Sequence, residues 1–346
     1  MRKIKIYSNH VIYCRSMLKH IQVTPLAGES LGTRSMCTYV ETPDVRILLD
    51  AGVSLCPNRF KLPPHPLEFK VIDESRKRIA EYAKKAEVVT ISHYHFDHHT
   101  PSFEDWLCNW TARNETAQQV YDGKMVLAKN SSEKINSSQR RRAWLFQKTG
   151  GKHAKKLEIA DGKTFAFEDS TKLRFSEPVF HGAEGSELGW VLIATVEFYN
   201  ERFVYAPDVQ GPMSLEATKR ILAEFPDLLM IGGPPTYLVD FKTSTNQIRF
   251  AFENLEKIVQ KVPCVIVDHH LLRDEGWRKK AGSVFEAAKK AKHSVLTAAE
   301  FVGKENLLLE ALRKKLYVEN KPQKEFEKWM RKSDDAKRFF KPPIDG

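Results

Sequence analysis

Four histidines and one aspartate lie within seven residues, in the segment His93-Tyr94-His95-Phe96-Asp97-His98-His99. The apolar residues 88–92 before it are typical of a buried strand, so the segment begins where a strand opens into a loop. So many imidazoles cannot all be core residues, and imidazole is the most common metal ligand in proteins. Alternate residues of an extended chain point the same way, so His93 and His95 can share one ion. After the chain turns, Asp97 and His98 can hold a second ion.

Further candidate ligands lie at the ends of other strand-like runs. Asp50, His181, Asp208 and His269 each stand at or just after the end of such a run. Runs of this kind alternate with amphipathic segments, which predicts an α/β protein. An isolated histidine is often a satisfied core residue, but an ordered set of this size is not.

The histidine segment resembles the His-x-His-x-Asp-His signature of the metallo-β-lactamase superfamily, and the other candidate ligands follow in that superfamily's order. The resemblance runs from about residue 26 to about residue 300 and implies a four-layer αββα sandwich with two metal ions. It assigns His93, His95 and His181 to the first ion, Asp97, His98 and His269 to the second, and Asp208 to both. Asp50 and His99 would orient these ligands without binding metal.

Four segments carry a narrower resemblance, to an archaeal family of metallo-β-lactamase-fold hydrolases without a known substrate. They are residues 30–36 (Ser-Leu-Gly-Thr-Arg-Ser-Met), 93–101, 208–212 (Asp-Val-Gln-Gly-Pro) and 232–238 (Gly-Gly-Pro-Pro-Thr-Tyr-Leu). This similarity spans nearly the whole chain. It implies a fold and a metal site.

Two assignments at the site have alternatives. His269 and His270 compete for the last ligand position, and we favour His269 because it directly follows the strand-like run. A proton donor for the leaving group could be Tyr237, His270 or His99, in no fixed order. Tyr237 has a second interpretation as a packed loop aromatic.

The expected chemistry is metal-dependent hydrolysis. Two Zn²⁺ ions, with Mn²⁺ or Fe²⁺ as alternatives for the same ligands, would share a bridging hydroxide that attacks the substrate. Asp97 and Asp208 would take part as catalytic ligands. A di-iron oxidoreductase of this superfamily would have a carboxylate in place of His95, so this histidine favours hydrolysis.

The substrate is expected to be anionic, because the formal net charge is +11. Arg140, Arg141, Arg142 and Arg34 are candidate phosphate contacts, which favours a phosphodiester or another phosphorylated substrate. The same arginines could also form a simple basic surface. One alternative is a lactone, ester or thioester hydrolase for a small metabolite. Another, from a different class, is a nucleic-acid-binding protein with a non-catalytic site.

The organisation expected is one domain over residues 1–346, with a basic helical insertion at about 104–163 over the active-site end. A charged helical extension would follow at about 298–346. The five cysteines are scattered without a CxxC pair, so we expect them to be reduced. No signal peptide or membrane span is indicated, which predicts a cytoplasmic protein without a membrane partner. The sequence makes no prediction of oligomeric state.

Overall fold

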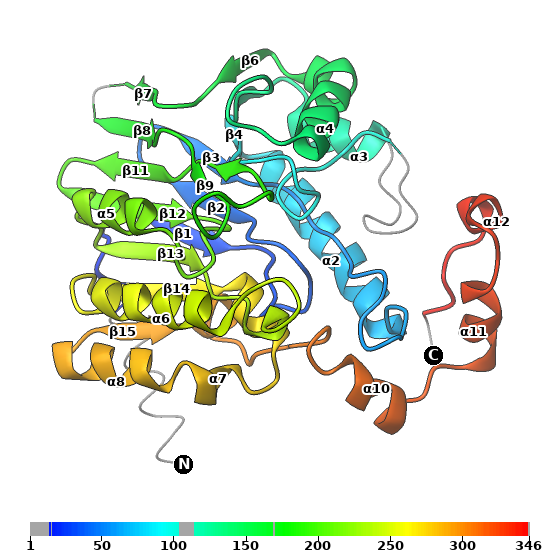
Figure 1. Cartoon of the computed structure of the whole chain (residues 1–346). Helices are drawn as coiled ribbons and strands as arrows, with labels where there is room; N and C mark the ends of the chain where they lie inside the picture. The colour runs from blue at the N-terminus through cyan, green and yellow to red at the C-terminus, as the bar shows by residue number, and fades with distance from the viewer. Residues whose placement is uncertain (1–13, 15, 104–113, 169, 345–346) are drawn as a thin grey trace.

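The computed structural model describes residues 14, 16–103, 114–168 and 170–344. Two sheets stack face to face, and helices cover both outer faces (Figure 1). The predicted four-layer αββα sandwich is therefore confirmed. None of the helices in these residues is long and apolar enough to cross a bilayer.

The first sheet has six strands in the order β1-β2-β3-β4-β5-β6. Its first three strands pair antiparallel, and β3 to β6 run parallel. The strands are Gln22–Pro25, Thr38–Glu41, Arg46–Leu49, Val88–Ile91, Met125–Ala128 and Lys156–Ile159. Strands β5 and β6 fall within residues 104–163, so two segments of the region expected as an insertion belong to this sheet.

The second sheet has seven strands in the order β15-β14-β13-β12-β11-β8-β7. Strands β12 to β15 run parallel, which places the carboxyl ends of β12, β13 and β14 at one edge. The strands β7, β8, β11, β12, β13, β14 and β15 are Thr164–Phe167, Thr171–Phe175, Ala194–Phe198, Glu201–Ala206, Leu228–Gly232, Cys264–Asp268 and Ser294–Leu296. A separate antiparallel pair, β9 (Val179–Phe180) and β10 (Trp190–Val191), lies before β11.

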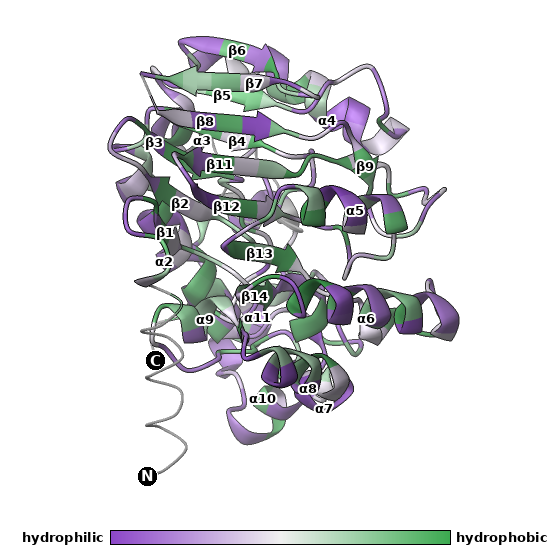
Figure 2. Ribbon diagram, turned by 90° about the vertical axis from the view of Figure 1, so that its left-hand side faces the viewer, coloured by the Kyte–Doolittle hydropathy of each residue, from purple (hydrophilic) through white to green (hydrophobic). Residues whose placement is uncertain are grey.

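Three hydrophobic clusters join these layers. One lies between the sheets and includes Ile47 and Phe203, and the others lie beneath the helices on the outer faces. The first sheet is covered by α2 (Pro66–Ala83), α3 (Asn114–Tyr121) and α4 (Ser137–Lys148), and the second by α5 (Leu215–Ala223), α6 (Thr245–Val259) and α8 (Gly282–Ala291). In Figure 2, α6 and α8 carry both hydrophilic and hydrophobic residues, as expected for helices that cover a sheet. Short helices complete the layers: η1 (Gly150–His153), η2 (Thr236–Leu238), η3 (His269–Arg273) and α7 (Trp277–Lys280).

Helix α2 begins earlier than its hydrophobic spacing predicts. The apolar periodicity is first visible at Ile72, but the helix starts at Pro66 behind a capping box formed by His65 and Glu68. A proline at the first helical position and a side-chain cap both satisfy or remove unpaired backbone N–H groups. The start of α2 is therefore determined by its cap.

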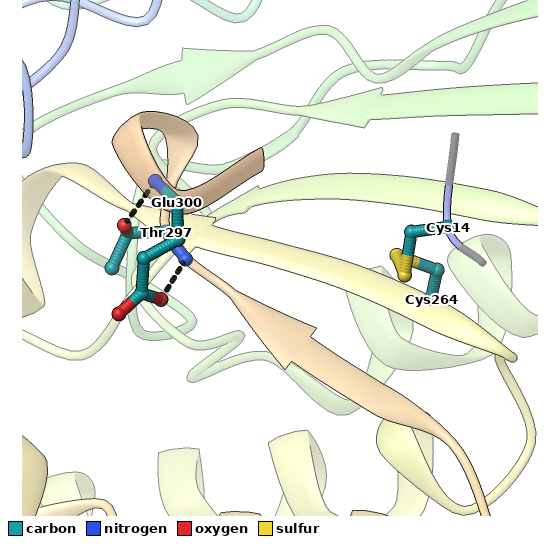
Figure 3. The surroundings of a disulfide bond; sticks show 4 residues. All are labelled: Cys14, Cys264, Thr297 and Glu300. Atoms are coloured by element: carbon teal, nitrogen blue, oxygen red, sulfur yellow. Dashed lines mark hydrogen bonds between the residues drawn. A yellow bond between two sulfur atoms is a disulfide. The ribbon is translucent and has the colours of Figure 1, made fainter. Parts of the chain in front are cut away.

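A disulfide joins Cys14 to Cys264 at the start of β14 (Figure 3), so the prediction of reduced cysteines is wrong for this pair. The two residues are separated by 250 positions, which no spacing rule could connect. Cys37 and Cys56 are free thiols.

We expect Cys14→Ser to lower the thermal midpoint of unfolding. The cross-link closes a very long loop, and such a bond is worth about 2–4 kcal/mol through its effect on the unfolded chain. Thermal melts of the Cys14→Ser variant, with and without reductant, measure the effect. Cys56→Ser is the control, and equal midpoints for the two variants would contradict the prediction.

The C-terminal extension is anchored to the sandwich by buried ion pairs. Glu310 pairs with Arg34 at 2.6 Å, and Arg313 pairs with Glu68 of α2 at 2.7 Å. Phe326 packs against Phe69 of α2. In Figure 1, the last helices of the chain, in dark orange and red, lie at the lower end of α2 and to its right. The helices of this region are α9 (Ala298–Phe301), α10 (Arg313–Glu319), α11 (Lys324–Met330) and α12 (Asp334–Phe339).

Arg313→Met is expected to destabilise the protein by about 3–5 kcal/mol, because it leaves the buried carboxylate of Glu68 without its cation. Arg313 is fully buried, and its guanidinium also donates to the backbone oxygens of Leu62 and Cys56. Denaturant unfolding measures the loss. Lys315→Met, which breaks an exposed pair with Glu319 in the same helix, should change the midpoint little.

Candidate metal centre

The predicted ligands come from loops at the ends of four strands. His93, His95, Asp97 and His98 follow β4, and His181 follows β9. Asp208 lies two residues after β12, and His269 directly follows β14. The structure brings all seven side chains together in one cluster.

Asp208 lies at the centre of this cluster. Its Oδ2 is 3.1 Å from His93 Nε2, 2.9 Å from His181 Nε2, 3.2 Å from His98 Nε2 and 3.9 Å from His95 Nδ1. Its carboxylate is almost completely buried. This arrangement allows one oxygen of Asp208 to face the histidines of both assigned ions.

The other oxygen of Asp208 faces the pair of histidines after β14. Oδ1 is 2.9 Å from His269 Nε2 and 3.1 Å from His270 Nε2. His269 also lies 3.5 Å from Asp97 Oδ2. The two histidines therefore both reach Asp208, and the contact with Asp97 distinguishes His269.

The side chains form sets whose ligand atoms all lie within 4.8 Å of one another. One set contains the residues that we name the first position: His93, His95 and His181, together with Asp208. Another contains the residues that we name the second position: Asp97, His98 and His269. Two overlapping sets are Asp50, His93 and His98, and Asp208, His269 and His270.

Asp50 lies behind the ligands and orients them. Its Oδ2 accepts from His98 Nδ1 at 2.8 Å, which turns His98 Nε2 toward Asp208. Its Oδ1 accepts from the backbone N–H of Ser92, directly before the histidine segment. A carboxylate that fixes the far nitrogen of an imidazole is a common support for a metal ligand.

Three residues of the cluster have backbone conformations that L-residues seldom adopt. The φ angles are 48° at Asp50, 48° at Asp208 and 66° at His269. Each follows the end of a strand, where a left-handed residue turns the chain sharply. Such conformations cost free energy and are concentrated at functional sites.

His99 lies outside the sets of candidate ligands. Its Nδ1 contacts the backbone oxygen of His95 at 2.9 Å, and its ring lies against Tyr94 and Phe146. Burial lowers the pKa of His99 to about 3. The neutral ring of His99 therefore supports the loop that carries His95.

The donor atoms of the cluster fit metal binding. Four buried atoms of the cluster have no hydrogen bond of suitable geometry within the described residues: His98 Nε2, His181 Nδ1, Asp208 Oδ1 and His270 Nε2. Unpaired buried polar atoms are costly, and three of these four lie beside ligand atoms of other loops. Nitrogen and carboxylate donors without a thiolate suit Zn²⁺, Mn²⁺ or Fe²⁺.

The electrostatics of the first position suit cation binding. Burial opposes charge on Asp208, but His269 and His181 hold the pKa of this carboxyl well below its ordinary value. Burial lowers the pKa of His95 to about 4 and that of His93 well below its ordinary value. Both imidazoles are therefore neutral at pH 7, which is the form that binds metal.

The sequence did not reveal a buried arginine beside the second position. Arg273 makes a close ion pair with Glu29, and its Nη2 lies 3.4 Å from Asp97 Oδ2. Its Nη1 donates to Tyr237 Oη at 3.1 Å, and Tyr237 Oη lies 3.1 Å from His270 Nδ1. The only local signal was its position four residues after His269, which is not a recognised motif.

The four predicted substrate arginines have different surroundings. Arg142 of α4 lies on the histidine segment, with its guanidinium 4.5 Å from the centre of the Phe96 ring. Arg140 and Arg141 are exposed on the same helix. Arg34 is bound to Glu310 by two hydrogen bonds of 2.6 Å. Arg142 alone among them is shown to contact the histidine segment.

The layer order and the histidine loops define a metallo-β-lactamase-fold protein, as the resemblance implied. The chain is 44% identical over 296 residues to a UPF0282 protein of Methanopyrus kandleri, covering 86% of this chain and 99% of that relative. A UPF0282 protein of Methanocaldococcus jannaschii is 43% identical over 297 residues, covering 86% and 96%. The chain therefore belongs to the UPF0282 family. No family model matches the chain.

Similar solved structures include a metallo-β-lactamase fold protein from Bacillus subtilis, with 14% identity and a TM-score of 0.45 over 80% of this chain and 96% of that one. A metal-dependent hydrolase of the β-lactamase superfamily has 12% identity, with the same TM-score and coverage. These similarities are too weak to bear on activity.

Proposed function

We propose that this protein is a metal-dependent hydrolase with a dinuclear centre that acts on a phosphodiester or another phosphorylated substrate. The observation that carries this proposal is Asp208, whose two oxygens face histidines of both positions within 3.2 Å. First-position residues His93, His95 and His181 would hold one ion. Second-position residues Asp97, His98 and His269 would hold the other.

Two zinc ions held by these residues would lower the pKa of water and polarise a phosphoryl or carbonyl oxygen. The protein's own residues would orient the metal ligands and supply charge for the substrate. Asp50 keeps His98 turned toward the centre, and Asp208 holds the two groups of ligands at one point. Arg142, on the rim of the histidine segment, supplies positive charge for an anionic substrate.

Tyr237 is the candidate proton donor with the best placement. Its hydroxyl touches His270 and Arg273, and burial raises the pKa of Tyr237 above its ordinary value. The hydroxyl is therefore protonated at neutral pH and can donate to a leaving group. His270 could serve the same step from 3.1 Å beside Asp208.

A lactone, ester or thioester hydrolase is the second candidate. It is favoured by the position of Arg34, which Glu310 neutralises, and by the exposure of Arg140 and Arg141 away from contacts with the histidine segment. A substrate without a phosphate would need fewer positively charged side chains beside the histidine segment.

Metal content and turnover test the proposal together. We expect two equivalents of metal per chain and hydrolysis of bis-p-nitrophenyl phosphate. If the protein binds metal but hydrolyses only lactones or thioesters, the second candidate function replaces the first. Nucleic-acid binding by a protein that holds no metal and hydrolyses neither class would overturn the enzyme assignment.

A further inference from the structure

The side chain of Gln139 in α4 bridges two backbones from different loops. Its Oε1 accepts from the N–H of Tyr94 at 3.1 Å, and its Nε2 donates to the carbonyl oxygen of Leu188 at 2.7 Å. Gln139 is completely buried. Both polar groups of one amide are therefore engaged in a place that water does not reach.

The two bridged loops are those of the first position. Tyr94 lies between His93 and His95, so its N–H belongs to the backbone that carries both ligands. Leu188 precedes Gly189, whose carbonyl oxygen accepts from the N–H of His181 at 2.9 Å. One side chain thus connects the strand-end loop after β4 to the loop after β9.

The surroundings are shaped for this contact. Gly189 has a φ of +94°, which favours glycine, and a Cβ there would make a tight contact of 3.1 Å with Gln139 Nε2. Asn136 caps α4 by accepting from Gln139 N, and its Nδ2 donates to the carbonyl oxygen of Glu187 at 2.8 Å. The start of α4 therefore donates hydrogen bonds to two consecutive carbonyl oxygens of the loop after β9, those of Glu187 and Leu188.

We propose that Gln139 is a positioning residue, which fixes the loop of His93 and His95 relative to the loop after β9. An amide is suited to this task because it accepts and donates at one planar group. The inference rests on the proposed metal centre. It gives α4 a role in assembling the first position, in addition to the predicted role of its arginines in substrate binding.

The test is Co²⁺ binding to the metal-free full-length protein, followed by visible absorption and by competition with a chelator. Gln139→Leu removes both hydrogen bonds, and Gln139→Glu keeps the acceptor but loses the donor. We expect 10–100-fold weaker binding of one Co²⁺ and an altered spectrum in Gln139→Leu, since support of a ligand is typically worth this much. Gln139→Glu should show a smaller change of the same kind.

Gln147→Leu is the matched control, because Gln147 lies on the exposed side of the same helix and contacts only Ser131 among the hydrogen bonds of its side chain. Asn136→Asp keeps the cap but loses the donor to Glu187, so it tests the attachment of α4 to the loop after β9 if Gln139→Leu does not fold. Weaker Co²⁺ binding in Asn136→Asp is expected.

A lower melting temperature with an unchanged cobalt spectrum and affinity in the Gln139 variants would show a merely structural role and overturn the inference. Absence of Co²⁺ binding by the unaltered protein would instead overturn the proposed function on which the inference rests.

Discussion

Replacing both His93 and His95 with alanine is expected to remove the ion of the first position and to abolish hydrolysis, while the chain stays folded. These two residues supply two of the three histidines of that position, and their ring nitrogens lie 3.0 Å apart. Losing them leaves His181 and Asp208, too few ligands for tight binding of a zinc ion. Elemental analysis after dialysis against zinc measures the loss.

A matched control removes two imidazoles elsewhere. His20 pairs with Glu201, and His153 contacts Asn114, both outside the cluster. The double variant His20→Ala/His153→Ala should keep its full metal content. Full metal occupancy in the His93→Ala/His95→Ala variant, with a normal circular dichroism spectrum, would mean that the metal binds elsewhere.

The parts of the site that the sequence could predict are local. His93, His95, Asp97 and His98 share one short segment whose spacing alone suggests metal binding. The strand before it is mostly apolar and β-branched, so its burial could also be predicted. A resemblance to known motifs then supplied the distant members of the cluster.

Residues that act through long-range contacts were missed. Arg273 meets Glu29 across 244 positions, and Gln139 meets Tyr94 across 45. A buried arginine or glutamine has no sequence pattern of its own, because its function depends on which backbone or carboxylate the fold places beside it.

The same cause applies to two further predictions. Arg34 is predicted to contact substrate, and the structure pairs it with Glu310 of the C-terminal extension, 276 positions away. Residues 125–128 and 156–159 were assigned to an insertion because polar and basic residues surround them. Strand β5 forms its hydrogen bonds with β4, and β6 forms its hydrogen bonds with β5, each with a partner more than thirty positions earlier in the chain.

Asp208→Asn is expected to lower hydrolysis by about 10³-fold or more and to weaken both ions. This substitution preserves size and removes one negative charge, and a loss of about 4 kcal/mol in the transition state corresponds to 10³-fold. Asp208 Oδ2 faces His93 and His181, whereas Oδ1 faces His269. Losing this carboxylate therefore affects the ligands of both positions.

Comparing Asp97→Asn with Asp208→Asn tests whether Asp208 is shared between two ions while Asp97 binds only one. Asp97 belongs with His98 and His269, and it is not in the set of His93, His95 and His181. We therefore expect Asp97→Asn to lose the second ion and keep the first, while Asp208→Asn binds both weakly. Zinc titration with a competing chelator distinguishes the two patterns. If Asp208→Asn retained one ion with unchanged affinity, Asp208 would serve a single position, and the two oxygens of its carboxylate would not be shared between the metals.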